Sequence, residues 1–338
     1  MSAVRTAFFG ELLVRLAVPG KQLLAQADAL DLHIAGAEAN VATGLASLGA
    51  SCRMISIVPD NALGRRALSA LQAVGIDCAN VQTKPGRMGL YFLTPGAGPR
   101  AADIIYDRAD SVFAQARAED FDWATAFSGM DRLHISGINP ALGPEPARTA
   151  LAAVKAAKAH GLTVSFDGNY RANLWAAWDS DPRAILSELI AHADIFFGNH
   201  RDMALLLGID FGTVDGEVRR RAAAEAAFKA FPNLKVIAST ARHTVTSDQH
   251  QLSARVDTPT DSAQTREVML SGIVDRIGAG DAFAAGILHG LDAGQGLEHA
   301  AHQGLALACL KHTLPGDASL FTQADIDSFL SGELDVRR

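Results

Sequence analysis

Short apolar runs alternate with amphipathic stretches along most of this chain. The runs lie at residues 53–58, 132–137, 162–167, 194–199 and 234–240. Each is short and flanked by polar or turn-forming residues, as buried strands are. Between two of them, Ala147, Leu151 and Val154 share one helical face and Gly161 supplies a stop. This alternation predicts an α/β fold with a doubly wound, mostly parallel sheet flanked by helices.

Two segments, residues 11–34 and 88–109, do not follow this alternation of apolar runs and amphipathic stretches, and they are predicted to be extended. The second contains two strand-like runs around the turn residues at 95–99, as in a β-hairpin with a long loop. We expect the two segments to form a small β-sheet lid outside the main sheet. No repeat or low-complexity linker divides the chain, so residues 1–338 are predicted to be a single domain.

Composition narrows the class of protein. With 338 residues, 49% of them hydrophobic, the chain can bury a sizeable core. Its net charge of −7 argues against a nucleic-acid partner, which normally requires a basic face. Cys52, Cys78 and Cys309 are far apart and are expected to be reduced thiols. No apolar run is long enough to span a bilayer, and a cytoplasmic protein without a membrane partner is predicted.

The stretch "DRIGAGDAFAAGILHGL" at 275–291 predicts a glycine turn that leads into a buried helix. Gly278, Ala279 and Gly280 would form the turn, and Asp281 would lie near the helix N-terminus, where unpaired N–H groups favour an anion such as phosphate. Asp281 has two interpretations from this segment alone. It is either an N-cap that stabilises the helix by about 1 kcal/mol, or a catalytic base beside a phosphate cradle.

A second glycine-rich segment, "AGAEANVATGLASLG" at 35–49, also predicts a helix start. Gly36 precedes it, and Glu38 and Asn40 are polar residues in its first turn. Taken alone this is a capped helix. Together with the 275–291 segment it supplies polar groups of the kind that bind a polyhydroxylated substrate.

The two glycine-rich segments, in this order and at this separation, resemble the two signatures of the ribokinase-like (PfkB-type) carbohydrate kinases. The resemblance covers essentially the whole chain. It implies transfer of the ATP γ-phosphoryl group to a sugar hydroxyl, with Asp281 as the general base. The N–H groups of Ala279, Gly280 and Asp281 would form an anion hole. Because no Lys follows the glycines, a P-loop is ruled out.

Within this family the chain is most similar to 2-keto-3-deoxygluconate kinases, in "FFGELLVRL" at 8–16, "IIYDRADS" at 104–111, "FDGNYRANLW" at 166–175 and "CLKHTLPGD" at 309–317. That likeness implies 2-keto-3-deoxy-6-phosphogluconate as product. Arg108 and Arg171 would clamp the substrate carboxylate, since Arg grips carboxylates at two points. Surface ion pairing is the alternative for both arginines. Tyr91 and Tyr106 would either contact the substrate or pack within the lid, and Gly36 and Asn40 would also bind it.

The resemblance further implies ATP and Mg²⁺ as cofactors. "GNHRD" at 198–202 is similar to the family's Asn-x-x-Glu element, so Asn199 and Asp202 would serve Mg²⁺ through water, with Asp in place of the usual Glu. The Lys-x-Gly-x-x-Gly-like element of many relatives is missing at 239–246, where Ser239 and Arg242 are the candidate nucleotide contacts. A K⁺ ion near Asp275 and the 312–318 loop is a further possibility, as in some relatives.

Several functions stay open from the sequence. The nearest alternative is a fructokinase or ribokinase of the same fold, which would not need the arginine pair. Another is a sugar-sensing protein that has lost catalysis. A dinucleotide oxidoreductase would need a GxGxxG after the first strand, and the chain has none there. The expected partners are a small sugar acid and ATP, and the protein is expected to be a homo-oligomer.

Overall fold

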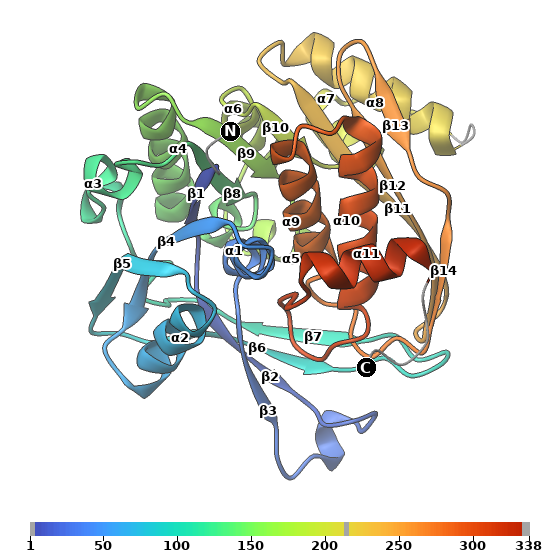
Figure 1. Cartoon of the computed structure of the whole chain (residues 1–338). Helices are drawn as coiled ribbons and strands as arrows, with labels where there is room; N and C mark the ends of the chain where they lie inside the picture. The colour runs from blue at the N-terminus through green and yellow to red at the C-terminus, as the bar shows by residue number, and fades with distance from the viewer. Residues whose placement is uncertain (1–3, 213–215, 333–338) are drawn as a thin grey trace.

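A ten-stranded sheet crosses the middle of the molecule and carries helices on both faces (Figure 1). The computed structural model describes residues 4–212 and 216–332. The strands of this sheet are β1 (Arg5–Phe9), β4 (Ser51–Pro59), β5 (Asp77–Lys84), β8 (Arg132–Ser136), β9 (Thr163–Asp167), β10 (Ile195–Phe197), β11 (Val236–Thr246), β12 (Gln249–Asp257), β13 (Ser262–Gln264) and β14 (Val268–Ser271).

The strand order is β13-β12-β11-β10-β9-β8-β1-β4-β5, with β14 also paired to β12. Every pair from β11 to β5 is parallel, whereas the pairs of β12 with β11, β13 and β14 are antiparallel. All five apolar runs predicted as strands belong to this sheet, as β4, β8, β9, β10 and β11. The predicted α/β fold with a mostly parallel sheet is confirmed.

The helices connect the parallel strands and cover the sheet (Figure 1). They are α1 (Ala37–Ser47), α2 (Ala62–Ala73), α3 (Trp123–Phe127), α4 (Pro144–Ala159), α5 (Ala172–Trp175), α6 (Pro182–Ile190), α7 (His200–Leu207), α8 (Gly216–Ala230), α9 (Ala279–Asp292), α10 (Leu297–Lys311) and α11 (Gln323–Ser331). The helix predicted around Ala147 is α4, and Gly161 follows its end with φ of +77°, which suits glycine. The helices predicted at the two glycine-rich segments are α1 and α9.

Alternate side chains of the central strands enter two hydrophobic clusters, one on each face of the sheet. In β1, Phe8 packs with α1, α9 and α10, whereas Ala7 and Phe9 pack with α4, α6 and α8. In β4, Met54 belongs to the same cluster as Phe8, and Ile55 belongs to the same cluster as Ala7 and Phe9. Because both faces are covered, apolar residues of these strands point to either face and follow one another closely in the sequence, which is why their runs are visible there.

A separate four-stranded sheet forms from the two segments that broke the pattern. Its strands are β2 (Leu13–Ala17), β3 (Asp31–Ala35), β6 (Gly89–Thr94) and β7 (Asp103–Asp107), in the order β3-β2-β6-β7. The antiparallel β6–β7 pair is the predicted hairpin. The inner face carries the row His33, Arg15, Tyr91 and Tyr106, which lie opposite one another across the strands.

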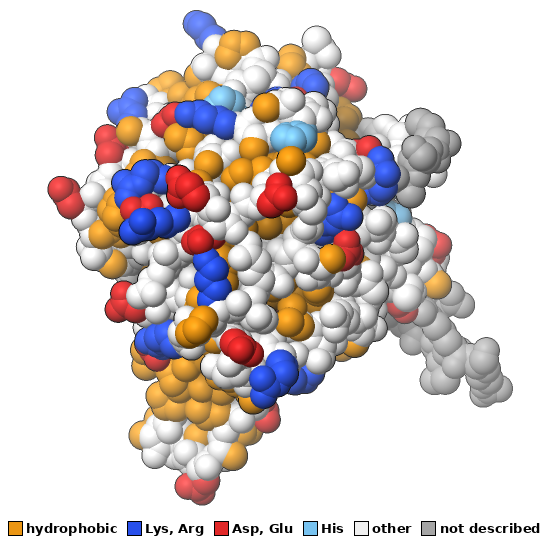
Figure 2. All heavy atoms as spheres, turned by 90° about the vertical axis from the view of Figure 1, so that its left-hand side faces the viewer, with side chains coloured by type: hydrophobic (Ala, Val, Ile, Leu, Met, Phe, Trp, Pro, Cys, Tyr) orange, Lys and Arg blue, Asp and Glu red, His pale blue; other side chains and the backbone are white. Residues whose placement is uncertain are grey.

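The outer face of this small sheet carries the apolar row Leu32, Leu16, Phe92 and Ile105. Leu32 is 40% exposed and Ile105 is 50% exposed. Figure 2 shows hydrophobic side chains gathered on the projection at the bottom of that view, where Figure 1 places the ends of β2 and β3. An apolar row of this kind is unusual on a surface that stays in water.

Two further sequence expectations can be compared with the structure. Cys52, Cys78 and Cys309 are free thiols. In residues 4–212 and 216–332 no helix combines the length and the apolar character needed to cross a membrane.

Candidate active site

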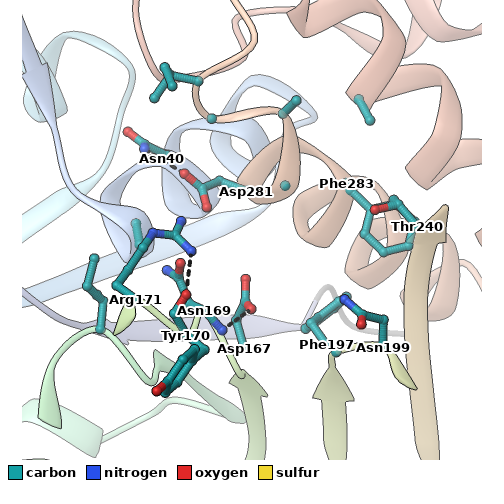
Figure 3. A pocket seen from close by; sticks show the side chains of 18 of the residues that line it. Asn40, Asp167, Asn169, Tyr170, Arg171, Phe197, Asn199, Thr240, Asp281 and Phe283 are labelled. Carbon is teal, nitrogen blue, oxygen red and sulfur yellow. Dashed lines mark hydrogen bonds between the residues drawn. The ribbon is translucent and has the colours of Figure 1, made fainter. Parts of the chain in front are cut away.

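A cavity of about 940 Å³ opens beyond the carboxyl ends of β9, β10 and β11, between the main sheet and the inner face of the small sheet (Figure 3). Its wall includes every residue that the sequence proposed for the site. These are Gly36, Asn40, Tyr91, Tyr106, Arg108, Arg171, Asn199, Asp202, Ser239, Arg242, Gly278, Ala279, Gly280 and Asp281. The topology explains this convergence, because the ends of parallel strands and the helices that follow them meet at one edge of the sheet.

Asp281 is held at this edge by a side-chain partner and not by a cap. Gly278 is the N-cap of α9, so Asp281 is the third residue of the helix and the N-cap interpretation is wrong. Its Oδ2 accepts a hydrogen bond of 2.7 Å from Nδ2 of Asn40. Burial raises the pKa of Asp281 to about 6, and the Asn40 hydrogen bond opposes this shift. The carboxylate is therefore ionised at neutral pH and still basic enough to accept a proton.

The turn before Asp281 needs glycine at one position for its fold and leaves open space at another. Gly278 has φ of +80°, and a Cβ there would lie 1.6 Å from the carbonyl oxygen of Asp317. A Cβ on Gly280 would meet nothing within 4 Å and would project into the cavity. The N–H of Ala279 is 3.4 Å from a carbonyl of the same turn, which is a weak contact. The first turn of α9 thus offers N–H groups and a partial positive charge to the cavity.

Three carboxylates crowd around Arg171. Burial raises the pKa of Asp167, at the end of β9, to about 8, with the negative charges of Asp281 and Asp202 adding to the shift. Burial also raises the pKa of Asp202. Arg171 opposes the shift at all three, and Figure 3 shows its guanidinium reaching from the N-terminus of α5 toward Asn40 and Asp281. Arg171 does not offset the shifts fully, and a divalent cation bound beside these carboxylates would lower their pKa further.

Asn199 and Asp202 form a capping box at the start of α7. The Asn199 side chain accepts a 2.8 Å hydrogen bond from the N–H of Arg201, and Asp202 Oδ2 accepts one of 2.7 Å from the N–H of Asn199. In the described part of the chain no three Asp, Glu, His or Cys side chains are close enough to ligate a metal together. The role of Asn199 and Asp202 toward Mg²⁺ through its water shell stays a prediction.

Arg108 lines the cavity, but it is already paired. Its Nε and Nη2 both donate to Glu11 Oε2, at 2.8 Å and 2.5 Å, and both residues are almost completely buried. Glu11 also accepts a hydrogen bond from Ser111. Arg108 is therefore not a free cation, and the sequence missed Glu11 as its partner. Arg171 differs, because it is exposed and donates only to the carbonyl of Tyr170 within the described chain.

The two tyrosines of the inner face of the small sheet serve the cavity differently. Tyr91 is buried, and its hydroxyl donates a short hydrogen bond to Asp317 Oδ2. Tyr106 lies opposite Tyr91 on β7 with a ring separation of 6.2 Å and is only half-buried. Of the two, Tyr106 is better placed to contact a ligand, whereas Tyr91 is bound into the wall.

Several arginines of the cavity wall lie around Arg242 of β11. Ser239 and Arg242, the candidates from the sequence, line the cavity together with Arg201 and Arg276. Partial desolvation and the positive charges of Arg276 and Arg201 lower the pKa of Arg242. None of these three arginines forms an ion pair with another described residue. Such a group of cations at the start of two helices favours a polyanion such as a triphosphate.

Sequence reasoning missed Asp167, Arg201 and Arg276. Asp167 could have been found, because it is the polar residue that ends a predicted strand, where ligands of parallel sheets bind. Arg201 and Arg276 lie inside motifs that were recognised, yet no spacing rule marked them out. Their role depends on how three separate segments meet in space.

The mostly parallel sheet flanked by helices and the small separate sheet beside the cavity match the ribokinase-like fold of carbohydrate kinases. The chain belongs to the pfkB family of carbohydrate kinases, whose family model matches residues 5–323.

Individual relatives are similar over almost their full length. The chain is 32% identical to a 2-dehydro-3-deoxygalactonokinase of Haloferax volcanii, with 96% of each chain covered. It is 29% identical to a 2-dehydro-3-deoxygluconokinase of Bacillus subtilis, over 90% of this chain and 89% of that one. The crystal structure of 2-dehydro-3-deoxygluconokinase from Thermotoga maritima superposes with a TM-score of 0.91 at 33% identity, covering 97% of this chain and 100% of that chain.

Proposed function

We propose that this protein transfers the γ-phosphoryl group of ATP to 2-keto-3-deoxygluconate and so produces 2-keto-3-deoxy-6-phosphogluconate. The observation that carries the proposal is Arg171, an exposed cation without an ion-pair partner among the described residues, which enters the same cavity as Asp281. A sugar acid offers a carboxylate to Arg171 and a hydroxyl to Asp281. A neutral sugar offers Arg171 no carboxylate to bind.

The residues around Asp281 suit phosphoryl transfer. Asp281 accepts the proton of the attacking hydroxyl, while Asn40 holds its carboxylate in place. The N-terminus of α9 stabilises the charge that develops on the transferred group. Arg201, Arg242 and Arg276 hold the phosphate chain of the nucleotide.

Magnesium fits the donor set at the strand ends. When bound with ATP, Mg²⁺ supplies positive charge to the phosphates. Asn199 and Asp202 would hold its water shell, and Asp167 is a further carboxylate of the cavity wall, whose pKa is raised by burial and by the charges of Asp281 and Asp202. K⁺, which the resemblance to the family allowed near Asp275 and the 312–318 loop, has no comparable support.

The small sheet forms one wall of the cavity, and we propose that it acts as the lid of a single-domain kinase. Tyr106 and Ile104 on β7 line the cavity from that side. A sheet in this position excludes water from the phosphoryl group and limits wasteful hydrolysis of ATP.

A coupled ADP-release assay tests the function directly. The acceptors are 2-keto-3-deoxygluconate, its C4 epimer 2-keto-3-deoxygalactonate, fructose and ribose, with Asp281→Asn as the inactive control. We expect a ketodeoxy acid to be preferred by orders of magnitude. The galactonate epimer is included because a relative at 32% identity carries that name. Preference for fructose or ribose would reassign the substrate, and no turnover with any acceptor would favour a sugar-sensing protein.

We further propose that the protein is a homo-oligomer that pairs through the outer face of the small sheet. Leu32 and Ile105 on that face are 40% and 50% exposed, which is costly for a sheet in water. Sedimentation should show an oligomer for the parent, and Leu32→Glu with Ile105→Glu should give a monomer. A parent that sediments as a monomer would contradict this proposal. Location in the cytoplasm stays a prediction from the sequence.

A further inference from the structure

Lys311, the last residue of α10, is completely buried, with 0% of its surface exposed. Its ammonium group donates hydrogen bonds to two main-chain carbonyls, at 3.3 Å to Asp275 and at 3.1 Å to Leu314. No carboxylate of the described residues lies within 4.0 Å to form an ion pair with it. A buried ammonium is costly, so a lysine in this position needs a reason beyond packing.

The two carbonyls belong to the segments that support the catalytic turn. Asp275 begins the segment that leads to Gly278 and Asp281, and Leu314 lies in the loop after α10. That loop contains Asp317, whose carbonyl oxygen would be only 1.6 Å from a Cβ on Gly278. Lys311 thus ties the turn of α9 to the loop against which it packs.

The charges around Lys311 favour its protonated form. Burial lowers the pKa of Lys311, but the carboxylates of Asp275 and Asp317 oppose that shift. The nearest charge of the same sign, Arg15, is neutralised because it forms ion pairs with Asp275 at 2.6 Å and Asp317 at 2.7 Å. A lysine at the C-terminus of a helix is also favoured by the helix dipole. In the opposite direction, the Lys311 charge lowers the pKa of Asp281.

We propose that Lys311 is a positioning residue that serves as a built-in cation and takes the place of a free monovalent ion beneath the anion-binding turn. An ammonium held by main-chain carbonyls, without a direct carboxylate, has the oxygen surroundings that suit K⁺. The sequence had allowed a K⁺ ion near Asp275 and the 312–318 loop, and Lys311 occupies the space between them. Catalysis would then not depend on added monovalent cations. The kinetic part of this inference rests on the proposed kinase function.

The test compares the parent with Lys311→Ala and Lys311→Met in choline, Na⁺, K⁺ and ammonium chloride at constant ionic strength. The parent should turn over at the same rate in all four salts. In choline, Lys311→Ala should lose about 10-fold to 100-fold in kcat with little change in KM, because a small misplacement of catalytic groups has effects of that size. K⁺ or ammonium should restore part of the rate to Lys311→Ala. Lys311→Met should not be restored, because its side chain fills the space.

A matched control is Lys155→Ala, which removes an exposed lysine that pairs with Glu188 on the surface. It should behave as the parent in every salt. A second readout needs no substrate: K⁺ or ammonium should raise the melting temperature of Lys311→Ala, since a ligand that binds only the folded state stabilises it, and should leave the parent unchanged.

Two outcomes would overturn the proposal. Activation of the parent by K⁺ over choline would mean that a free cation binds in addition to Lys311. Loss of activity in Lys311→Ala without any response of rate or melting temperature to cations would mean that Lys311 only packs. If no acceptor is phosphorylated at all, the proposed function fails, and the melting experiment still decides the role of Lys311.

Discussion

Arg108→Ala should lower the stability of the protein, whereas Arg171→Ala should lower its activity with a sugar acid. The sequence had suggested one shared role for both arginines. Arg108 is 5% exposed and bound to Glu11, which is 2% exposed. Arg108→Ala therefore leaves a buried carboxylate without its counter-charge. Arg171 is exposed and has no such partner, so Arg171→Ala leaves the free protein nearly unchanged and removes a cation only from the cavity.

The magnitudes follow from these surroundings. Breaking a buried pair by removing one partner costs about 3–5 kcal/mol of stability. At about 2 °C per kcal/mol for a chain of this size, Arg108→Ala should melt about 6–10 °C lower. Arg171→Ala should change stability by less than about 0.5 kcal/mol. Because Arg171 is exposed to solvent, its loss should cost about 2 kcal/mol of binding to the sugar acid, or roughly 30-fold in kcat/KM.

Thermal melts and steady-state kinetics with 2-keto-3-deoxygluconate and fructose separate the two effects. Any fructose activity should survive Arg171→Ala, and Arg171→Lys should recover only part of the sugar-acid activity. Arg148→Ala, which breaks an exposed pair with Glu145, is the control and should change neither measurement. The double variant Glu11→Gln with Arg108→Met should recover part of the lost stability, because no lone charge remains buried.

The reasoning would be refuted by Arg108→Ala melting like the parent while losing sugar-acid activity as strongly as Arg171→Ala. That result would make Arg108 a substrate clamp whose contact with Glu11 contributes nothing to the fold. Equal loss of sugar-acid and fructose activity in Arg171→Ala would instead mean that Arg171 does not bind a carboxylate.

The remaining predictions concern the turn, its base and the lid. Asp281→Asn should lower kcat by about 100-fold or more at unchanged ATP affinity. The kcat of the parent should fall as pH drops below about 6, where Asp281 becomes protonated. A kcat that stays constant from pH 5 to 8 would contradict the role of Asp281 as the base. Gly280→Ala should melt like the parent but lose activity because its methyl group enters the cavity. Gly278→Ala should fail to fold stably, because alanine is disfavoured at a φ of +80°. Equal melting temperatures for the two variants would contradict these different roles of Gly278 and Gly280. Deletion of residues 95–99 should raise sugar-independent ATPase relative to kinase activity, and an unchanged ratio would remove the small sheet from the mechanism.

The sequence predicted most of the buried parallel part of the sheet because strands covered on both faces are rich in consecutive apolar residues. The antiparallel edge of the sheet was not predicted. β12 reads "QHQLSARVD", in which apolar residues are too sparse to stand out, and it pairs antiparallel with its neighbours. β1 lies in the middle of the sheet, yet it begins with the polar residues Arg5 and Thr6, and its apolar end runs directly into the motif at 8–16. Mixed polarity, rather than a wrong period, hid these two strands.

For the site, the candidate residues proposed from the sequence all line the cavity, but their partners were not predictable. Nothing in the sequence indicates that Glu11 binds Arg108, since the two are 97 residues apart and meet only because β2 pairs with β6 and β6 with β7. For Asp281 the sequence allowed two interpretations, and the structure removes one of them. Gly278 is the N-cap of α9, and Asp281 accepts a hydrogen bond from Asn40 instead, so the catalytic base stays the remaining prediction.

Arg15 joins the small sheet to the turn of α9. It lies on β2, a central strand of the small sheet, and its guanidinium forms buried ion pairs with Asp275 and Asp317, on the two segments that hold this turn. Since breaking a buried pair costs about 3–5 kcal/mol, movement of β2 away from the turn would be strongly unfavourable. The lid closure that we propose would therefore turn about β2 and keep β2 in place beside the turn of α9. In that case the same ion pairs position the proposed lid and the N–H groups proposed to stabilise the transferred phosphoryl group.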